Sequence, residues 1–323
     1  MSPASPLTLR VEARKLEADG IVAFHLVGAQ GELLPGFDAG AHIDVEAGPG
    51  RVRQYSLCNP SASPTYYEIA VLKEPASRGG STFMHDELRS GAELLASAPR
   101  NHFELVDDVP VLLLAGGIGI TPLLAMAHQL AAQGRSFELH YCTRSRSRAA
   151  FKARLEGASY AGSVHFHFDD EDASQRLDVA AILAKATPEH HLYVCGPGGF
   201  IQHVLDTATQ AGWEGDRLHR EFFSAPPTPA TKAPDESFEV ELASCGRRLD
   251  VPAGKSVLAV LLDAGMDVPA SCEAGVCGTC LLRVIEGTPD HRDVYLTDEE
   301  HATNDCFTPC CSRSLSRRLV LDL

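Results

Sequence analysis

The feature of this sequence that most constrains its fold is a group of cysteines near the C-terminus. Cys272, Cys277 and Cys280 follow the pattern C-x4-C-x2-C. That spacing is typical of the first three ligands of a plant-type [2Fe–2S] cluster, which needs a fourth thiolate further along the chain. Three later cysteines are available for that role: Cys306, Cys310 and Cys311.

Two other interpretations of these cysteines are a zinc site and a chance grouping of small buried residues. Zinc sites more often contain two C-x2-C pairs, whereas this segment has one pair extended by a C-x4-C arm. Gly275 and Gly278 lie between the cysteines. Without a Cβ they let the loop curl, so that backbone N–H groups can point at the sulfur atoms. The pattern therefore favours the iron–sulfur cluster.

Length, charge and apolar content narrow the classes of protein to which this chain can belong. A length of 323 residues allows two or three domains. The formal net charge of −15 argues against nucleic acid as a partner. The sequence has no run of 18 apolar residues, and it does not begin like a signal peptide, so we expect no membrane span. The other cysteines are scattered, which favours a reducing cytoplasm over a disulfide framework.

The first hundred residues predict an antiparallel barrel or sandwich. Short β-rich segments are punctuated by Gly and Pro. We expect one helix over residues 82–89, with Ser81 as its N-cap. The predicted strands are residues 7–18, 21–27, 41–47, 54–58 and 66–73.

Two segments of this region could bind a phosphorylated cofactor. One strand carries Arg53, Gln54, Tyr55 and Ser56, which offer a cation, an aromatic ring and a hydroxyl. Taken alone, such a strand is more often plain surface. The second segment, Arg78-Gly79-Gly80-Ser81, precedes the predicted helix, where free backbone N–H groups can bind an anion. Together they indicate a phosphate site.

From Val109 onward the sequence predicts a doubly wound parallel α/β sheet. Residues 109–115 form a continuous apolar run, as expected of a buried parallel strand. Further strands are predicted at 137–142, 164–168, 191–195 and 217–222, and they alternate with helices.

Ligands of such sheets bind at the carboxyl ends of the strands. Three candidate segments follow strands there. The glycine turn departs from the Rossmann G-x-G-x-x-G pattern, since Pro122 replaces the third glycine, and a tight turn without a ligand is the alternative. Taken alone, Cys195 would more often be a small buried residue than a catalytic one, but at the end of a parallel strand before Gly196-Pro197 it can face the cleft. The candidate residues are Gly117, Gly119 and Thr121; Thr143 and Arg144; and Cys195, Gly196 and Pro197.

A Pro-rich segment over residues 225–237 reads as a linker to the last domain. We predict four parts: residues 1–105 as the barrel domain, 106–226 as the parallel α/β domain, 227–236 as the linker and 237–323 as the iron–sulfur domain.

The order of these modules resembles the phthalate dioxygenase reductase family, which includes vanillate demethylase reductases, over nearly the whole chain. The motifs that carry the resemblance are Arg53 to Ser56, Arg78 to Ser81, Gly116 to Pro122, Cys195-Gly196-Pro197, Glu221-Phe222-Phe223, Cys272 to Cys280, His291-Arg292-Asp293 and Cys310 to Arg313. The resemblance implies a β-grasp ferredoxin fold at the C-terminus and FMN rather than FAD in the barrel.

The resemblance also implies roles for single residues. Arg53 and the Gly79-Gly80-Ser81 turn would hold the FMN phosphate. Tyr55 and Ser56 would meet the isoalloxazine, with the strand Ala70-Val71-Leu72-Lys73 beside it, and Gln54 and Arg78 would also belong to the cofactor-binding residues. Phe223 would close the nicotinamide domain over the flavin, and Cys310 would be the fourth iron ligand. We predict Ser56 and Cys195 as the catalytic residues.

The predicted function is electron transfer from NADH through FMN and the [2Fe–2S] cluster to a separate Rieske-type oxygenase of aromatic demethylation or hydroxylation. FMN accepts a hydride and passes on single electrons, which the cluster carries. NADPH stays possible, because Arg144, Arg146 and Arg148 follow the second strand, where an arginine could bind a 2′-phosphate. The alternatives are a stand-alone flavin reductase or NADH oxidase, and a non-enzymatic Fe–S carrier.

Overall fold

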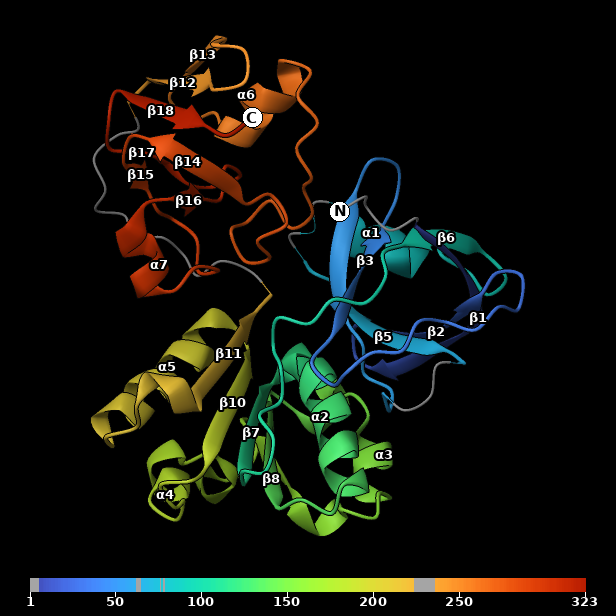
Figure 1. The fold of residues 1–323 in the computed structure, drawn as a ribbon. Coiled ribbons are helices and arrows are strands. Elements are labelled where there is room, and N and C mark those ends of the chain that lie inside the picture. Colours follow the sequence, from blue (N-terminus) through green and yellow to red (C-terminus); the bar gives the residue numbers. More distant parts are fainter. Residues whose placement is uncertain (1–5, 62–64, 76, 78, 224–235) are drawn as a thin grey trace. The chain divides into compact units, whose positions relative to one another are not determined.

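The computed structural model describes residues 6–61, 65–75, 77, 79–223 and 236–323, apart from the side chain of Asp298 (Figure 1). The chain divides into two compact units, Met1–Glu221 and Phe222–Leu323. Within the described ranges, no helix is long and apolar enough to cross a membrane.

The N-terminal part of the first unit is an antiparallel six-stranded sheet that closes on itself. Its order is β4-β3-β6-β1-β2-β5. Just beyond β4, the Cys58 N–H donates to the Glu68 carbonyl of β5 over 2.9 Å, which links the two edge strands. The predicted barrel is confirmed. The strands are β1 (Leu7–Ala18), β2 (Ile21–Gly28), β3 (His42–Glu46), β4 (Val52–Ser56), β5 (Tyr67–Leu72) and β6 (Glu93–Ala96).

The helix of the barrel, α1 (Gly80–Asp86), begins and ends earlier than expected. The prediction of Ser81 as its N-cap was wrong, because Gly79 occupies that position with a left-handed φ of 99°. The Ser81 hydroxyl instead accepts from the Glu74 N–H over 3.1 Å and donates to the Ser77 hydroxyl over 3.0 Å. Only glycine adopts that φ at little cost, so the turn fixes the start of the helix.

The rest of the first unit is the predicted parallel sheet, with the order β11-β10-β7-β8-β9. The central strand β7 pairs in parallel with both β8 and β10, so the strand order reverses there. Ligands of open α/β sheets bind at such a reversal. The elements are β7 (Val111–Gly116), α2 (Ile120–Ala132), β8 (Phe137–Thr143), α3 (Lys152–Glu156), β9 (Val164–Phe168), α4 (Val179–Leu183), β10 (His191–Gly196), α5 (Gly198–Gln210) and β11 (Leu218–Phe222).

The second unit is a mixed sheet, ordered β13-β12-β18-β14-β16, whose core includes the apolar residues of α6. Strands β12 and β18 are parallel, because the last strand of this unit pairs with the unit's first strand. This architecture fits the β-grasp expectation. The elements are β12 (Phe238–Leu242), β13 (Arg248–Val251), α6 (Val257–Asp263), β14 (Leu282–Glu286), β15 (Pro289–Asp290), α7 (Asp298–Thr303), β16 (Cys306–Phe307), β17 (Arg313–Ser314) and β18 (Arg318–Leu321).

A buried ion pair joins the barrel to the parallel-sheet part of the first unit. Both guanidinium Nη atoms of Arg154, on α3, donate to the carboxylate of Glu68, on β5, over 2.6 and 2.7 Å. His25 Nε2 lies 3.0 Å from the same carboxylate. Burial alone would raise the pKa of Glu68, but its hydrogen bonds with Arg154 and His25 and their charges outweigh that effect and lower the pKa.

Replacing Arg154 by Ala would leave the Glu68 carboxylate buried without its bidentate partner. The Glu68 side chain is 1% exposed and that of Arg154 34% exposed. We expect a loss of about 3 kcal/mol in the free energy of unfolding at neutral pH, the low end for a buried pair because Arg154 is partly solvated. A carboxyl with a lowered pKa stabilises above its unfolded pKa, so the difference between wild type and variant should shrink as the pH falls into the acid range.

Denaturant unfolding at several pH values checks this expectation. Arg146→Ala, which breaks an exposed pair with Glu171, is the matched control and should change stability little. An Arg154 variant as stable as the Arg146 variant would contradict the assignment.

Candidate functional site

The candidate phosphate site lies where the turn before α1 meets β4. A Cβ placed on Gly80 would come within 2.9 Å of Arg53 Cγ and 3.0 Å of Arg53 Nε. The guanidinium stem of Arg53 therefore lies directly against the glycine backbone. A side chain here would fill the space beside the cation, so the pair of glycines is suited to an anion such as a flavin phosphate.

A second arginine at this turn was missed from the sequence. A Cβ on Gly79 would lie 3.1 Å from Arg51 Nε. Arg51 immediately precedes β4, two residues before Arg53, and that spacing on a strand puts both side chains on one face. This period-two signal was readable in the sequence. Arg78, also predicted here, lies outside the described residues.

The next residues of β4 have different environments. Tyr55 packs against the barrel core, and burial raises the pKa of its hydroxyl. Gln54 Nε2 lies 3.2 Å from His42 Nε2 on the neighbouring strand β3. Ser56 is buried at the end of the strand.

The predicted flavin-side strand is β5 with the residue that follows it. Ala70 and Val71 are buried, and the Val71 carbonyl accepts from His85 Nε2 over 2.8 Å. Lys73 is exposed and holds both carboxylate oxygens of Asp86 at 2.7 Å. The Lys73 ammonium is therefore engaged by α1. Leu72, the last residue of β5, packs against the core of the adjacent parallel sheet.

The loops that follow β7 and β10 meet at the reversal of strand order. A Cβ on Gly119 would overlap the carbonyl oxygen of Cys195, and one on Gly196 would come within 2.9 Å of the Gly116 Cα. The two candidate loops are thus in backbone contact. Gly117 has a φ of 53°, in the left-handed region. Pro197 is the N-cap of α5.

This contact brings the two predicted catalytic residues next to a third, Glu221, at the end of β11. The Ser56 hydroxyl donates to Glu221 Oε2 over 3.4 Å, and Cys195 Sγ lies 4.0 Å from the same oxygen. The group spans both parts of the first unit. In the sequence Glu221 appeared only within a motif, without a role.

Burial gives this group unusual protonation states. Desolvation raises the pKa of Glu221 to about 8, against a small opposing effect of the Ser56 hydrogen bond. The residue keeps some surface, but no cation among the residues that the structure describes offsets the effect of burial on its carboxyl group. Burial likewise raises the pKa of the Cys195 thiol. At neutral pH both are uncharged, so the pocket can hold and orient protons without a fixed charge.

Thr121 and Thr143 lie buried at the carboxyl edge of the sheet. The Thr121 hydroxyl donates to the Ile118 carbonyl over 3.1 Å, and the Thr143 hydroxyl to the Ser145 carbonyl over 2.9 Å. Both hydroxyls therefore shape their own loops. Arg144 is exposed, while Arg146 pairs with Glu171 and covers the ring of Phe168. Phe223 falls in the second unit and is 40% exposed.

In the second unit, the candidate cluster ligands form two thiol pairs. Cys272 hydrogen-bonds with Cys277, and Cys280 with Cys310. The hydrogen bond from Cys272 lowers the pKa of Cys277, which favours a thiolate at that position. The backbone N–H groups of Ala274 and Thr279 point at sulfur atoms, at 3.4 Å from Cys272 Sγ and 3.5 Å from Cys277 Sγ. Two thiol pairs accompanied by backbone N–H donors are a donor set suited to a [2Fe–2S] cluster, in which each iron takes two thiolates.

Cys311 hydrogen-bonds with its neighbour Cys310 and also contacts two hydroxyl groups. Its thiol lies 3.3 Å from the Thr308 hydroxyl and 3.8 Å from the Ser312 hydroxyl. A Cβ on Gly275 would overlap Cys311 Sγ, and Gly275 also has a left-handed φ of 70°. Cys311 therefore packs behind the loop. Cys306 lies on β16 and belongs to neither of the two thiol pairs.

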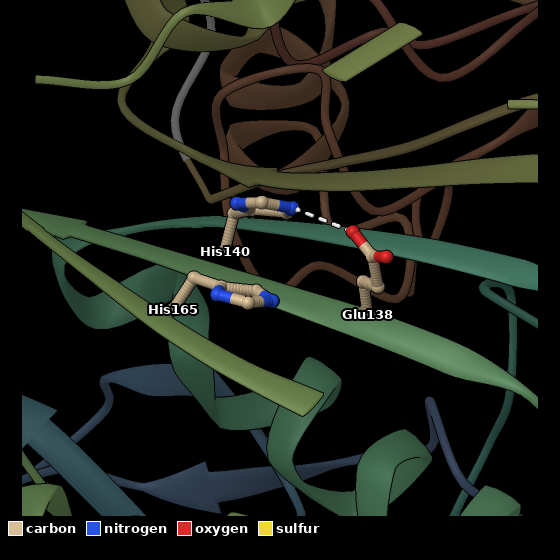
Figure 2. Close-up of side chains that lie close together, drawn as sticks. All are labelled: Glu138, His140 and His165. Carbon is tan, nitrogen blue, oxygen red and sulfur yellow. Dashed lines mark hydrogen bonds and ion pairs between the residues drawn. The ribbon is translucent and has the colours of Figure 1, made fainter. Parts of the chain in front are cut away.

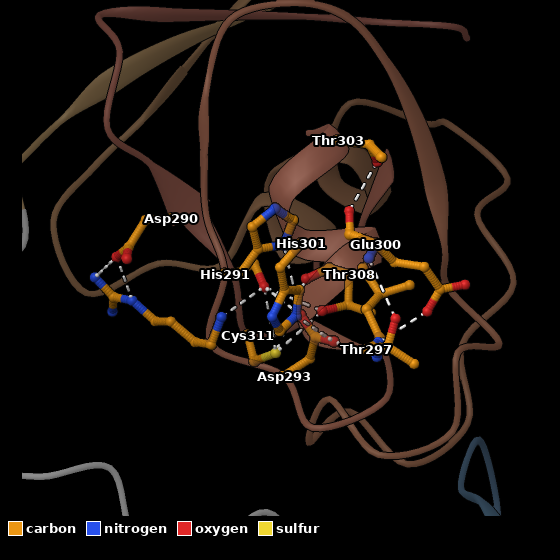
Figure 3. A network of polar contacts seen from close by, with 12 residues as sticks. Asp290, His291, Asp293, Thr297, Glu300, His301, Thr303, Thr308 and Cys311 are labelled. Carbon is orange, nitrogen blue, oxygen red and sulfur yellow. Dashed lines mark hydrogen bonds and ion pairs between the residues drawn. The ribbon is translucent and has the colours of Figure 1, made fainter. Parts of the chain in front are cut away.

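A polar network supports this loop from behind (Figure 3). Asp293 is buried and accepts from the Ser312 hydroxyl over 3.3 Å and from the Leu296 N–H over 2.9 Å. His301 Nε2 lies 3.3 Å from Asp293 Oδ2, and its ring stacks on His291. The Val294 N–H donates to the Gly275 carbonyl over 3.0 Å, which ties the network to the loop.

Comparison with known proteins places this arrangement in a family. Residues 113–206 match an oxidoreductase NAD-binding domain, and residues 240–315 a 2Fe-2S iron-sulfur cluster binding domain. The chain is 54% identical over 314 residues to the vanillate O-demethylase oxidoreductase of Pseudomonas sp. strain HR199, covering 97% of this chain and 98% of that protein. A solved structure of phthalate dioxygenase reductase, described as modular for electron transfer from pyridine nucleotides to [2Fe–2S], matches with a TM-score of 0.77 and 39% identity over 99% of this chain and 98% of that one.

The chain belongs to the phthalate dioxygenase reductase family. A further similar structure, with a TM-score of 0.86 and 38% identity, is an intact type IV self-sufficient cytochrome P450 monooxygenase; the match covers 98% of this chain and 41% of that one. As a member of this family, the protein is an oxidoreductase that uses a pyridine nucleotide and a [2Fe–2S] cluster.

The first prediction from the reductase's site concerns the fourth cluster ligand. Cys310→Ala should abolish the visible absorbance of the cluster, because the Cys280 pair would lose one thiolate. Cys311→Ala should retain it, since that thiol contacts hydroxyls behind the loop. Absorbance and iron content of the purified variants give the measurement, with Cys306→Ala as the control. Loss of the cluster in Cys311→Ala alone would reverse the assignment.

The second prediction concerns Glu221. A carboxyl whose folded pKa is about 8 and whose ordinary value is 4.5 loses stability as the pH rises between these values, because the unfolded chain ionises first. Gln mimics the protonated form, so Glu221→Gln should gain thermal stability relative to wild type as the pH rises from about 6 to about 8. Calorimetry at several pH values measures this trend.

The exposed Glu214, just before β11, supplies the matched control. Glu214→Gln should show no pH-dependent gain. A constant difference between Glu221→Gln and wild type across the same range would mean that Glu221 is already ionised at neutral pH.

Proposed function

We propose that this reductase supplies electrons from NADH to a separate Rieske-type oxygenase that O-demethylates a methoxylated aromatic acid of the vanillate class. The observation that carries the proposal is that one chain combines the Ser56–Cys195–Glu221 group with two cysteine pairs, Cys272–Cys277 and Cys280–Cys310. The Ser56–Cys195–Glu221 group suits the binding of a nicotinamide, which donates two electrons at once. The cysteines suit a cluster, which carries one electron at a time. The high identity to a vanillate O-demethylase oxidoreductase along nearly the full length supports this class of oxygenase over phthalate.

We infer that β4 and the turn before α1 hold FMN. Arg53, with Arg51 beside it, would neutralise the phosphate, and the Gly79-Gly80-Ser81 turn would let its oxygens approach the backbone. Arg78 is proposed for the same turn from the family motif. Tyr55, Gln54 and Ser56, together with residues 70–73, would line the ring system. FMN when bound takes up a hydride and releases single electrons.

The residues around Cys195 would prepare the site for the nicotinamide. A dinucleotide is expected to bind at the reversal of strand order. The loops there carry no bulky side chains that would keep it from the backbone, since they contain Gly117, Gly119, Gly196 and Pro197. Ser56 and Cys195 are proposed as catalytic residues, and the neutral Glu221 carboxyl would hold the Ser56 hydroxyl in place. The buried thiol and carboxyl also exclude water, which protects a hydride in transit.

Other residues have supporting roles in this proposal. Thr121 and Thr143 would position the loops around the dinucleotide, Phe223 would cover the flavin, and Arg144 would lie near the adenosine end. NADH is proposed over NADPH because Arg146 is already occupied by Glu171. Cys272, Cys277, Cys280 and Cys310 would bind the cluster.

The proposed parts of the chain are the FMN domain (1–105), the nicotinamide domain (106–226), the linker (227–236) and the ferredoxin domain (237–323). A cytoplasmic location is proposed from the cluster thiolates, which persist in a reducing compartment.

The experiment that tests the proposal is reconstitution with a purified oxygenase. The reductase, the oxygenase component of a vanillate O-demethylase, NADH, O2 and vanillate should together release one formaldehyde, the demethylated aromatic acid and water for each NADH and O2 consumed. Omitting the oxygenase, or using Cys310→Ala, should stop formaldehyde release. In one parallel assay, the oxygenase component of a phthalate dioxygenase and phthalate replace the vanillate oxygenase component and vanillate. In another, NADPH replaces NADH.

Three outcomes would count against the proposal. If the reductase supplies electrons to the phthalate oxygenase as fast as to the vanillate oxygenase, the assignment of the substrate class is wrong. A higher kcat/KM with NADPH would overturn the choice of NADH. Rapid NADH oxidation that is unaffected by both oxygenases and by loss of the cluster would instead support a stand-alone flavin reductase.

A further inference from the structure

One face of the parallel sheet carries a cluster of imidazoles and a carboxylate that the electron-transfer function does not use. Glu138 and His140 alternate on β8, and His165 and His167 alternate on β9. His140 pairs in register with His165, so all four side chains are on the same face. Strand β9 is the edge of the sheet.

Three of these side chains converge on one point (Figure 2). Single ligand atoms of Glu138, His140 and His165 all lie within 4.8 Å of one another. The rings of His140 and His165 stack with centroids 4.8 Å apart, and both extend toward the Glu138 carboxylate. His140 is buried, whereas Glu138 and His165 are exposed. An ion from solvent can therefore reach a site that is anchored by a rigid inner ligand.

The hydrogen bonds around His140 determine which ring nitrogen carries its proton. His167 Nδ1 lies 3.0 Å from the Gln175 carbonyl oxygen, which can only accept, so His167 Nδ1 carries the proton. His167 Nε2 of a neutral ring then accepts, and its partner at 3.1 Å, His140 Nδ1, must donate. In neutral His140 the lone pair is consequently on Nε2.

That lone pair points at another acceptor. His140 Nε2 lies 3.3 Å from Glu138 Oε2. Two acceptors face each other across this gap, so a positive centre between them would be stabilised. A proton is the simplest candidate, but burial, together with smaller effects of the nearby His165 and His167, lowers the pKa of His140 to about 4 although the Glu138 carboxylate opposes the shift. A metal ion, which binds neutral imidazole, meets no such obstacle.

We propose that Glu138, His140 and His165 form a binding site for a divalent transition-metal ion of the Zn²⁺ class. The ligands would be His140 Nε2, a ring nitrogen of His165, the Glu138 carboxylate and water. Two imidazoles and one carboxylate are a common donor set for Zn²⁺, whereas Mg²⁺ and Ca²⁺ prefer oxygen alone.

The outer contacts of the site are those of a metal-binding histidine. A liganding imidazole usually donates its other N–H to a fixed acceptor, which sets the tautomer and the ring orientation. Here His140 donates to His167, and His167 to the backbone of residue 175. His167 is thus a positioning residue. A bound ion would crosslink β8 to the edge strand β9. Thr143 lies three residues beyond His140, about 10 Å along the strand, so the crosslink would not occupy the nucleotide loop itself.

The test uses untagged full-length protein with its iron–sulfur cluster and flavin loaded, so that the cluster thiolates are occupied. After dialysis against a chelator, Zn²⁺ alone is titrated in competition with a chromophoric chelator, and bound zinc and iron are counted by elemental mass spectrometry. We expect one zinc ion per chain with no loss of iron or of cluster absorbance. Zn²⁺ should also raise the thermal midpoint of the first unit.

Single substitutions identify the ligands. Glu138→Gln and His165→Gln should each weaken Zn²⁺ binding at least tenfold, and His167→Gln should weaken it about 10- to 100-fold through the tautomer of His140. All three leave the apolar core intact. His203→Gln, an exposed histidine of α5, is the matched control and should bind like wild type.

The alternative outcomes are distinct. Zinc that binds only as iron is lost would mean capture by the cluster cysteines. Zinc that stays bound in Glu138→Gln and His165→Gln would indicate another group, such as His291, Asp293 and His301. Binding no stronger than that of an isolated surface histidine would mean that the cluster is only an exposed patch. Each of these results would overturn the proposal.

Discussion

The arrangement of the first unit depends on the backbone contact between the loops that follow β7 and β10. Gly119 and Gly196 have no side chains, so the two loops can touch. Any larger residue would separate the carboxyl ends of neighbouring parallel strands. The separation would move Cys195 relative to Glu221 and thus to Ser56 on the barrel. A steric requirement in the backbone therefore fixes a group of side chains drawn from three distant segments.

Three buried ionisable groups of this unit reach different charge states for identifiable reasons. Glu68 remains ionised because Arg154 binds it with two hydrogen bonds. Glu221 has only a hydroxyl and a thiol nearby, so burial favours its neutral form. His140 is held neutral by burial and by the neighbouring imidazoles, although the Glu138 carboxylate lies 3.3 Å away. Burial favours the neutral form in all three cases, and only the bidentate arginine outweighs it.

The sequence predicted the modules well, because their signals are local. The strand over residues 164–168 was placed with its observed bounds, and the cysteine spacing identified the cluster domain. Contacts between distant segments were not predictable. Ser56 and Glu221 are 165 residues apart, and spacing could not distinguish Cys310 from its neighbour Cys311. The N-cap of α1 was missed because Gly79 and Ser81 both suit a helix start, and the choice depends on where Ser77 and Glu74 lie.

The bidentate contact between Arg154 and Glu68 has a consequence for building chimeric reductases. The two residues belong to segments that look like separate modules in the sequence, and a recombination point near residue 105 would seem natural. A hybrid made there could inherit the carboxylate from one parent and an unsuitable side chain from the other. The ion pair makes the barrel and the parallel sheet a single exchangeable block, and the better crossover is the boundary after Glu221, where the two compact units divide.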